Sequence, residues 1–146
     1  MPHMVIIKGG AYGAFTSRGN KVGVKEWQMI VKQATERTPK IKGPCKLQLR
    51  FVLPPNRYPT DHPYGPDVDN LASAVMDALN ETIFSDVPGK DGAVLWLETL
   101  KLKAEKEEDA QLIIFVEALP KKVVTLKGSD DYYLGPLMKA QRNKRR

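Results

Sequence analysis

The sequence PDVDNLASAVMDAL, residues 66–79, decides how this chain folds. The apolar residues after Pro66 recur at helical spacing, which predicts a helix with one buried stripe formed by Leu71, Ala74, Val75, Ala78 and Leu79. Asp67 and Asp69 precede this stripe and stand two residues apart. On the extended segment that Pro66 favours, residues i and i+2 point to the same side. Two carboxylates held together at the positive end of a helix are typical ligands of a divalent cation.

The flanking sequence predicts the rest of the fold. Strict alternation of apolar and polar residues over 45–53 indicates a half-buried strand. Shorter patterns predict a first strand at 4–7, a third at 93–103 and a fourth at 111–116, the last apolar enough to lie centrally. A first helix over 24–36 has an apolar face of Trp27, Ile30, Val31 and Ala34. The order β-α-β-α-β-β predicts an α/β (α+β) fold, a mixed sheet of about four strands with two helices packed on one face.

Length and charge divide the chain unevenly. The 146 residues suit a single folded domain, which we place at 1–119, followed by a basic extension at 120–146. The extension carries eight Lys or Arg against two Asp and therefore holds all of the net charge of +6. A neutral body with a basic tail is expected of a protein that binds a polyanion. A solubilising, frayed terminus explains the same residues equally well.

Cysteine usage and hydropathy indicate the cellular compartment in which we expect this protein. The lone Cys45 has no disulfide partner and opens a strand, so we interpret it as an inert core thiol. No stretch approaches the roughly 20 apolar residues of a membrane helix, and the N-terminus lacks the layout of a secretory signal. We therefore expect a cytoplasmic protein and no membrane contact.

The acidic pair supports two interpretations. Asp69 can cap the second helix while Asp67 is an ordinary turn residue. Alternatively, both bind Mg²⁺ together with an acid from elsewhere, for which Asp91 before the third strand and Asp86 are the candidates. In a mixed sheet the start of the third strand can lie beside the N-terminus of the second helix. An EF-hand is excluded, because Leu71 occupies the next ligand position.

Basic and glycine-rich loops are candidates for phosphate contact. The glycine-rich stretch 9–19 can approach a phosphate backbone with Arg18 and Lys21, although it lacks the ending of a P-loop. Arg57 lies in the proline-rich loop 56–66, in which we interpret His62 as an exposed imidazole rather than a ligand or base.

These residues resemble the RusA-type endodeoxyribonucleases, a family of Holliday junction resolvases. The family has an Asp-x-Asp-Asn-Leu block, a helix with Asp-Ala-Leu, and a short turn that ends in an Asp pair before a strand. The matching segments of this chain are DVDNL at 67–71, DALN at 77–80 and DGAV at 91–94, followed by Lys101.

The resemblance implies a homodimer that binds four-way DNA junctions and nicks opposed strands with Mg²⁺. Asp67, Asp69 and Asp91 would then be the catalytic, metal-binding carboxylates, with Asp86 as the other candidate for the third position. This chain departs from the family at the first turn of the helix, where Ser73 stands in place of a frequent lysine. The role of that family lysine can be taken by Lys90 or Lys101, and either lysine can offset phosphate charge on DNA.

The sequence therefore predicts a Mg²⁺-dependent structure-selective endodeoxyribonuclease. A rival interpretation is a catalytically silent DNA-junction-binding protein, which lost its cleavage activity when Ser73 replaced the family's lysine. A third is a structural α+β protein whose acids are caps and turns.

Overall fold

The structure, a computed structural model, describes residues 2–8, 21–58, 60–62 and 64–120. Its elements follow the predicted order, with short 3-10 turns added between them. The strands and α-helices are β1 (His3–Lys8), α1 (Lys21–Thr35), β2 (Cys45–Leu53), α2 (Val68–Leu79), β3 (Val94–Lys103) and β4 (Gln111–Ala118). The turns are η2 (Pro55–Arg57), η3 (Lys90–Ala93) and η4 (Glu107–Asp109).

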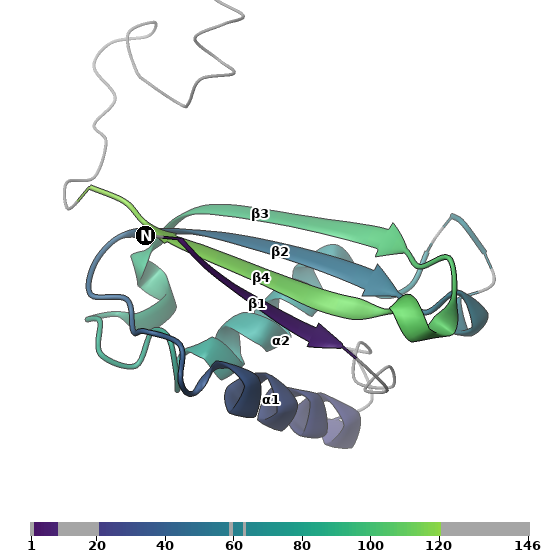
Figure 1. Ribbon diagram of the computed structural model, residues 1–146, viewed down its shortest axis with the longest axis horizontal. Coiled ribbons are helices and arrows are strands. Elements are labelled where there is room, and N and C mark those ends of the chain that lie inside the picture. Colours follow the sequence, from purple (N-terminus) through teal and green to yellow (C-terminus); the bar gives the residue numbers. More distant parts are fainter. Residues whose placement is uncertain (1, 9–20, 59, 63, 121–146) are drawn as a thin grey trace, which may run out of the picture.

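The four strands form one mixed sheet in the order β1-β4-β2-β3. β2 and β3 are parallel, whereas β4 runs antiparallel to both β1 and β2. Both helices lie on the same side of this sheet (Figure 1), which confirms the predicted α+β layer. β4 is central, as its apolar sequence predicts.

The core lies between the helices and the inward face of the sheet. On β2, alternate residues from Cys45 to Leu53 are buried, because a strand with one covered face sends every second side chain into the core. Trp27 and Val31 of α1 pack into the same cluster. Ala34 was predicted on that face but is exposed, and Thr35 is buried in its place.

Thr35 is accommodated because its hydroxyl is fully partnered. Its Oγ1 donates to the carbonyl oxygen of Val31 at 2.7 Å and lies 2.8 Å from Oγ1 of Thr82. Within the described ranges, no helix is long and apolar enough to cross a membrane.

Candidate metal and DNA site

α2 begins two residues earlier than the metal and capping interpretations assumed. Asp67 is the N-cap, with φ −60° and ψ 139°, and its carbonyl oxygen accepts the amide of Leu71 at 3.1 Å. Asp69 already lies in the first helical turn, so the predictions of Asp69 as the cap and of an extended Asp67–Asp69 pair are both wrong. Proline at 66 leaves Asp67 extended, and the helix starts directly after it.

The Asp67 carboxylate makes no capping hydrogen bond, although capping is the usual role of an aspartate in this position. Both Asp67 and Asp69 are exposed to solvent. Both side chains lie at the N-terminal end of the helix, where the helix dipole is positive. This end of α2 therefore presents acidic oxygens to solvent, and such oxygens are suited to a hard cation.

Lys101 of β3 holds the segment that leads into α2. Its Nζ donates to the carbonyl oxygen of Tyr64 and, at 2.9 Å, to that of Pro66. The Tyr64 hydroxyl in turn donates to the carbonyl oxygen of Leu53 at 3.2 Å. The loop is thus fixed to the C-terminal ends of β2 and β3, and the ammonium bonds the residue that directly precedes Asp67.

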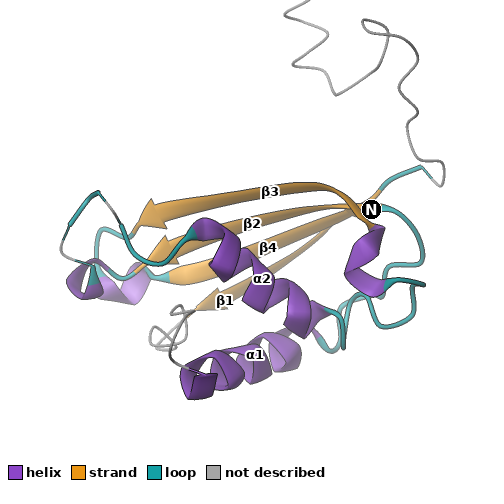
Figure 2. Cartoon of the chain, turned by 180° about the vertical axis from the view of Figure 1, so that it is seen from behind, coloured by secondary structure: helices purple, strands orange, loops and turns teal. Residues whose placement is uncertain are grey.

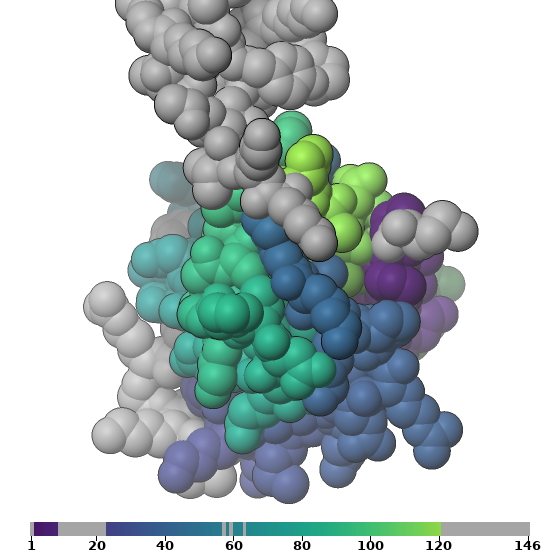
Figure 3. Space-filling model, turned by 90° about the vertical axis from the view of Figure 1, so that its left-hand side faces the viewer, coloured from purple at the N-terminus to yellow at the C-terminus, as the bar shows by residue number. Residues whose placement is uncertain are grey.

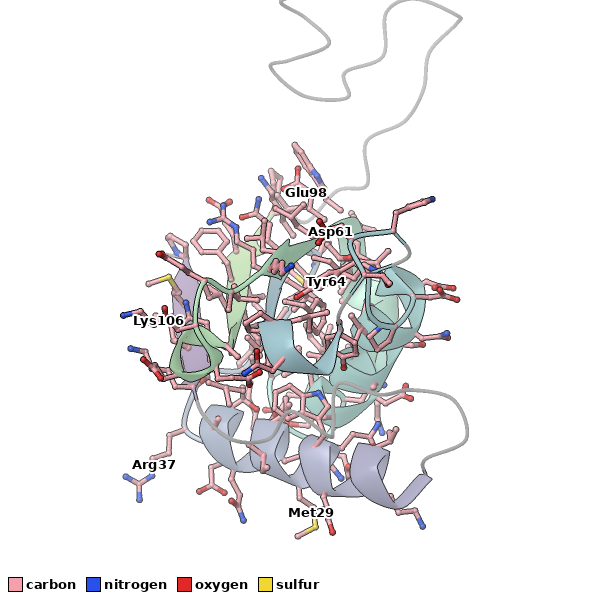
Figure 4. The ribbon with its side chains drawn as sticks, turned by 90° about the vertical axis from the view of Figure 1, so that its right-hand side faces the viewer. Met29, Arg37, Asp61, Tyr64, Glu98 and Lys106 are labelled. Atoms are coloured by element: carbon pink, nitrogen blue, oxygen red, sulfur yellow. The ribbon has the colours of Figure 1, made fainter. Side chains whose placement is uncertain are left out.

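Two further contacts surround this loop. The rings of Tyr58 and Tyr64 meet edge to face, with centroids 5.7 Å apart. Lys103 Nζ lies 3.1 Å from the carboxylate of Asp61, in an exposed ion pair. Figure 4 looks onto this end of the molecule, with Asp61 and Tyr64 on the opposite side from Met29 of α1. The carboxyl ends of parallel strands are where ligands bind in open α/β sheets.

Asp91 lies at the other end of α2. The side chain of Asn80, the C-cap of the helix, joins it through two hydrogen bonds. Asn80 Nδ2 donates to Asp91 Oδ2 at 3.2 Å, and the backbone amide of Asp91 donates to Asn80 Oδ1 at 2.9 Å. Figure 3 looks onto this end, where the segment around 80–93 (green) lies beside the segment 36–45 (blue).

The length of α2 separates Asp91 from the first two acids. A helix of 12 residues spans about 18 Å at about 1.5 Å per residue. Among the described residues, no three His, Cys, Asp or Glu side chains lie close enough together to hold a metal ion. The expectation that the start of the third strand lies beside the N-terminus of the second helix is therefore wrong, because β3 begins near the C-terminal end of α2.

Asp86 and Lys90 also lie beyond the C-terminal end of the helix. Asp86 is exposed, with Oδ1 3.8 Å from Lys40 Nζ. Lys90 is exposed and has a positive φ of 51°, following Gly89 at φ 77°. Neither residue lies near Lys101 in the described chain, so the proposed DNA contacts divide between two ends of the molecule.

The remaining predicted DNA contacts are only partly visible. Arg18 lies outside the described residues, and the side chains of Lys21 and Arg57 are not described, although α1 begins at Lys21 and η2 ends at Arg57. His62 is exposed, as predicted. Sequence reasoning assigned no role to Asn80, and the only available signal was its place directly after the Asp-Ala-Leu motif.

Two comparisons with known proteins bear on this geometry. A protein-family model described as endodeoxyribonuclease RusA matches residues 11–117 of the 146-residue chain. A search among curated proteins gave no matching relative.

Proposed function

Since the chain belongs to the endodeoxyribonuclease RusA family, we propose that it is a Mg²⁺-dependent enzyme that nicks four-way DNA junctions in pairs. The observation that carries this proposal is the N-terminal end of α2. The carboxylates of Asp67 and Asp69 are exposed there, and that of Asp67, the N-cap residue, makes no capping hydrogen bond. They lie beside the loop that Lys101 fixes through the carbonyl oxygen of Pro66. A helix end built only for stability would use the Asp67 side chain as its cap.

Asp67 and Asp69 are the residues that would hold the metal. Mg²⁺ in phosphoryl-transfer sites is commonly held by one or two carboxylates, with waters and substrate phosphates in the other positions. When bound, the ion supplies an activated water and stabilises charge on the scissile phosphate. The protein's own part is to fix both acids on a rigid helix end that DNA can reach.

Asp91 completes the proposed site from a second copy of the chain. About 18 Å of helix lies between Asp91 and the N-terminal acids of its own copy. In the proposed dimer, a two-fold related copy whose α2 runs the opposite way would supply its Asp91 beside Asp67 and Asp69. This arrangement accounts for a homodimer, and it gives two sites for the two opposed strands of a junction.

Lys101 takes the role that the family gives to a lysine on the helix. Ser73 occupies that helical position and is exposed. Lys101 brings an ammonium to the same end of α2 from β3, through its bond to the carbonyl oxygen of Pro66. It positions Asp67 and offsets phosphate charge, while Arg18, Lys21, Arg57 and Lys90 extend the DNA contact.

Cleavage of a labelled synthetic four-way junction tests the proposal, with a linear duplex alongside and with Mg²⁺ or EDTA. We expect paired nicks in the junction only with Mg²⁺. Asp69→Asn abolishes them and leaves junction binding intact, whereas Asp77→Asn, an exposed acid further along α2, changes neither. Cleavage by Asp69→Asn at the wild-type rate would overturn the metal assignment.

One observation favours a second candidate function, a catalytically silent junction-binding protein. Ser73, the sixth residue of α2, cannot supply the positive charge that the family has at this helical position. Salt-sensitive junction binding by the wild type, without any Mg²⁺-dependent product, would establish this alternative.

A further inference from the structure

The side of the sheet away from the helices is uncovered in the part of the chain that the structure describes. Figure 2 shows both α-helices on one side of the four strands. Leu112, Ile114 and Val116 of β4 are buried in the core, so the residues that alternate with them point to the other side. We call this other side the outer face. It consists of the even-numbered residues of β1 (4–8), β2 (46–52) and β3 (96–102) and the odd-numbered residues of β4 (111–117).

The outer face carries large apolar side chains across its whole width. They include Met4 and Ile6 of β1, Ile113 and Phe115 of β4, and Leu100 and Leu102 of β3. The register sets Met4 beside Phe115 and Ile6 beside Ile113, so the side chains of the first two strands are contiguous. Met4 is 62% exposed and Leu100 is 50% exposed. A sheet face that remains in water is normally polar, and a broad exposed apolar patch marks an interaction surface.

The end of β4 directs the chain's own C-terminal segment to this face. β4 is an interior strand that ends at Ala118, and the amide of Leu119 donates to the carbonyl oxygen of Pro44 at 2.8 Å. The chain therefore leaves the sheet from its middle rather than from an edge. Residues 121–146 follow, outside the described residues and beyond the range 11–117 that the family model matches.

This segment has an apolar part and a basic part. VVTL at 123–126 and YYLGPLM at 132–138 contain large apolar side chains, whereas KAQRNKRR at 139–146 contains none. Segments that remain in solvent are usually poor in apolar residues. The composition of 123–138 therefore indicates that this part is covered by another surface, and the outer face begins at the strand from which the segment emerges.

Length and charge both suit this occupant. β4 has eight residues, so the outer face is about 26 Å long at about 3.3 Å per residue. Residues 123–138 reach up to about 53 Å when extended, enough to cross the face and return. Lys121 and Lys122 precede the apolar part, and Glu117 is an acid of the outer face at the same end of β4. A segment of the same chain also has an effective concentration that is roughly millimolar, which favours it over a second molecule.

We propose that residues 123–138 fold back across the outer face of their own chain and cover its apolar side chains. The basic end at 139–146 then stays in solvent, where a polyanion can reach it. The inference goes beyond the proposed function, because the cover involves none of the proposed metal-binding or DNA-contacting residues.

Thiol labelling of the full chain tests the cover. Leu100→Cys places a thiol on the outer face and Met29→Cys places one on α1, at positions where the natural side chains are 50% and 57% exposed. The natural Cys45 is buried and does not compete for the reagent. Two thiols with such similar exposure should react at similar rates if nothing covers either. We expect the Leu100→Cys variant to react at least about tenfold more slowly, because its labelling requires the cover to open.

Charges placed in the apolar part of the segment should remove this protection. Leu134→Asp combined with Leu137→Asp should raise the labelling rate of the Leu100→Cys variant by about tenfold, because burial of unpaired carboxylates is unfavourable. The rate of the Met29→Cys variant should not change.

The matched control is Gln141→Asp combined with Asn143→Asp, which adds the same charge to the basic end and should leave both labelling rates as they were. If the Leu100→Cys variant reacts equally fast in all three backgrounds, the segment does not cover the outer face. Protection that falls on dilution would assign the face to a second copy, and protection that appears only when DNA is added would assign it to nucleic acid. Either result would overturn the inference. The labelling requires no Mg²⁺ and no cleavage, so a failure here leaves the nuclease proposal to be judged by its own assay.

Discussion

Two inactive variants should restore activity to each other if the proposed metal site is shared between copies. The perturbation is to combine Asp69→Asn in one subunit with Asp91→Asn in the other. Each change alone removes one proposed ligand from both sites of a homodimer. In a mixed dimer, one site loses both ligands and the other keeps its full set.

The magnitude follows from the geometry of α2. Ligand oxygens lie about 2.1 Å from Mg²⁺, so two oxygens on one ion are separated by at most about twice that distance. The ends of α2, by contrast, are about 18 Å apart for its 12 residues. Asp91 is also tied to Asn80 at the far end by hydrogen bonds of 2.9 and 3.2 Å. No side-chain rotation closes such a gap within one copy.

The assay uses the two variants co-expressed with different affinity tags and purified through both tags. The mixed dimer has one intact site out of two, so it should nick a labelled junction in one strand without resolving it. Random assortment without tag selection gives about a quarter of the wild-type number of intact sites, because about half of the dimers are mixed. The matched negative control combines Asp69→Asn with Asp67→Asn, since both residues belong to the same end of α2 and every site loses a ligand.

Failure of complementation would refute the reasoning directly. If the Asp69→Asn and Asp91→Asn pair is as inactive as its control, the acids do not act across a dimer. If Asp91→Asn alone cleaves as well as wild type, Asp91 is not a ligand at all.

Three further outcomes follow from individual residues. Lys101→Met should lower cleavage by roughly tenfold or more, since it leaves the carbonyl oxygens of Tyr64 and Pro66 without their donor. Lys103→Met loses an exposed ion pair with Asp61 and a cation–π contact with Tyr64 at 5.9 Å, but no bond to the loop backbone, so it should cleave at nearly the wild-type rate. Equal losses in the two variants would contradict the positioning role of Lys101. Gly65→Ala should lower the free energy of unfolding by more than Gly89→Ala does, because only at position 65 would the added Cβ lie 2.7 Å from Leu53 Cδ1. Gly89→Ala, the control, should lose only the roughly 1–2 kcal/mol expected for a left-handed alanine. Urea unfolding measures both variants. Burial raises the pKa of the Cys45 thiol from 9.0 to about 11. The unfolded chain therefore releases this proton first, and the free energy of unfolding falls as the pH rises from 9.0 towards 11. Native protein at pH 9 should resist a thiol reagent that labels the unfolded chain, and rapid labelling of the native protein would contradict the burial.

Much of the fold was predictable because one face of each strand is covered. The alternation over 45–53 matched β2 residue for residue, since a shift of one position would expose every core side chain. The first helix was less predictable. Thr35 is buried and Ala34 is exposed, the reverse of the prediction, because the Thr35 hydroxyl forms a hydrogen bond with Thr82. Thr82 lies 47 residues away, so no local pattern reveals this partner.

The candidate site was predictable only for residues that lie close together in the sequence. Asp67 and Asp69 belong to one motif, and the structure places them at one helix end. Lys101 was visible in sequence as a possible replacement for the helical lysine. Its bond to the carbonyl oxygen of Pro66, however, depends on a contact across 35 residues. The place of Asp91 depended on the adjacent, parallel pairing of β2 and β3, which the sequence did not determine.

The topology itself explains why the proposed site would require two copies. β2 and β3 are adjacent and parallel, so α2, which connects them, returns antiparallel to both. The start of β3 is then bound to lie near the end of α2, however the turn between them is built. An acid just before α2 and an acid just before β3 therefore lie at opposite ends of one helix. In the proposed dimer, a two-fold axis normal to the sheet would reverse one helix relative to the other and bring the two kinds of acid together twice, once for each strand that a paired nick must cut.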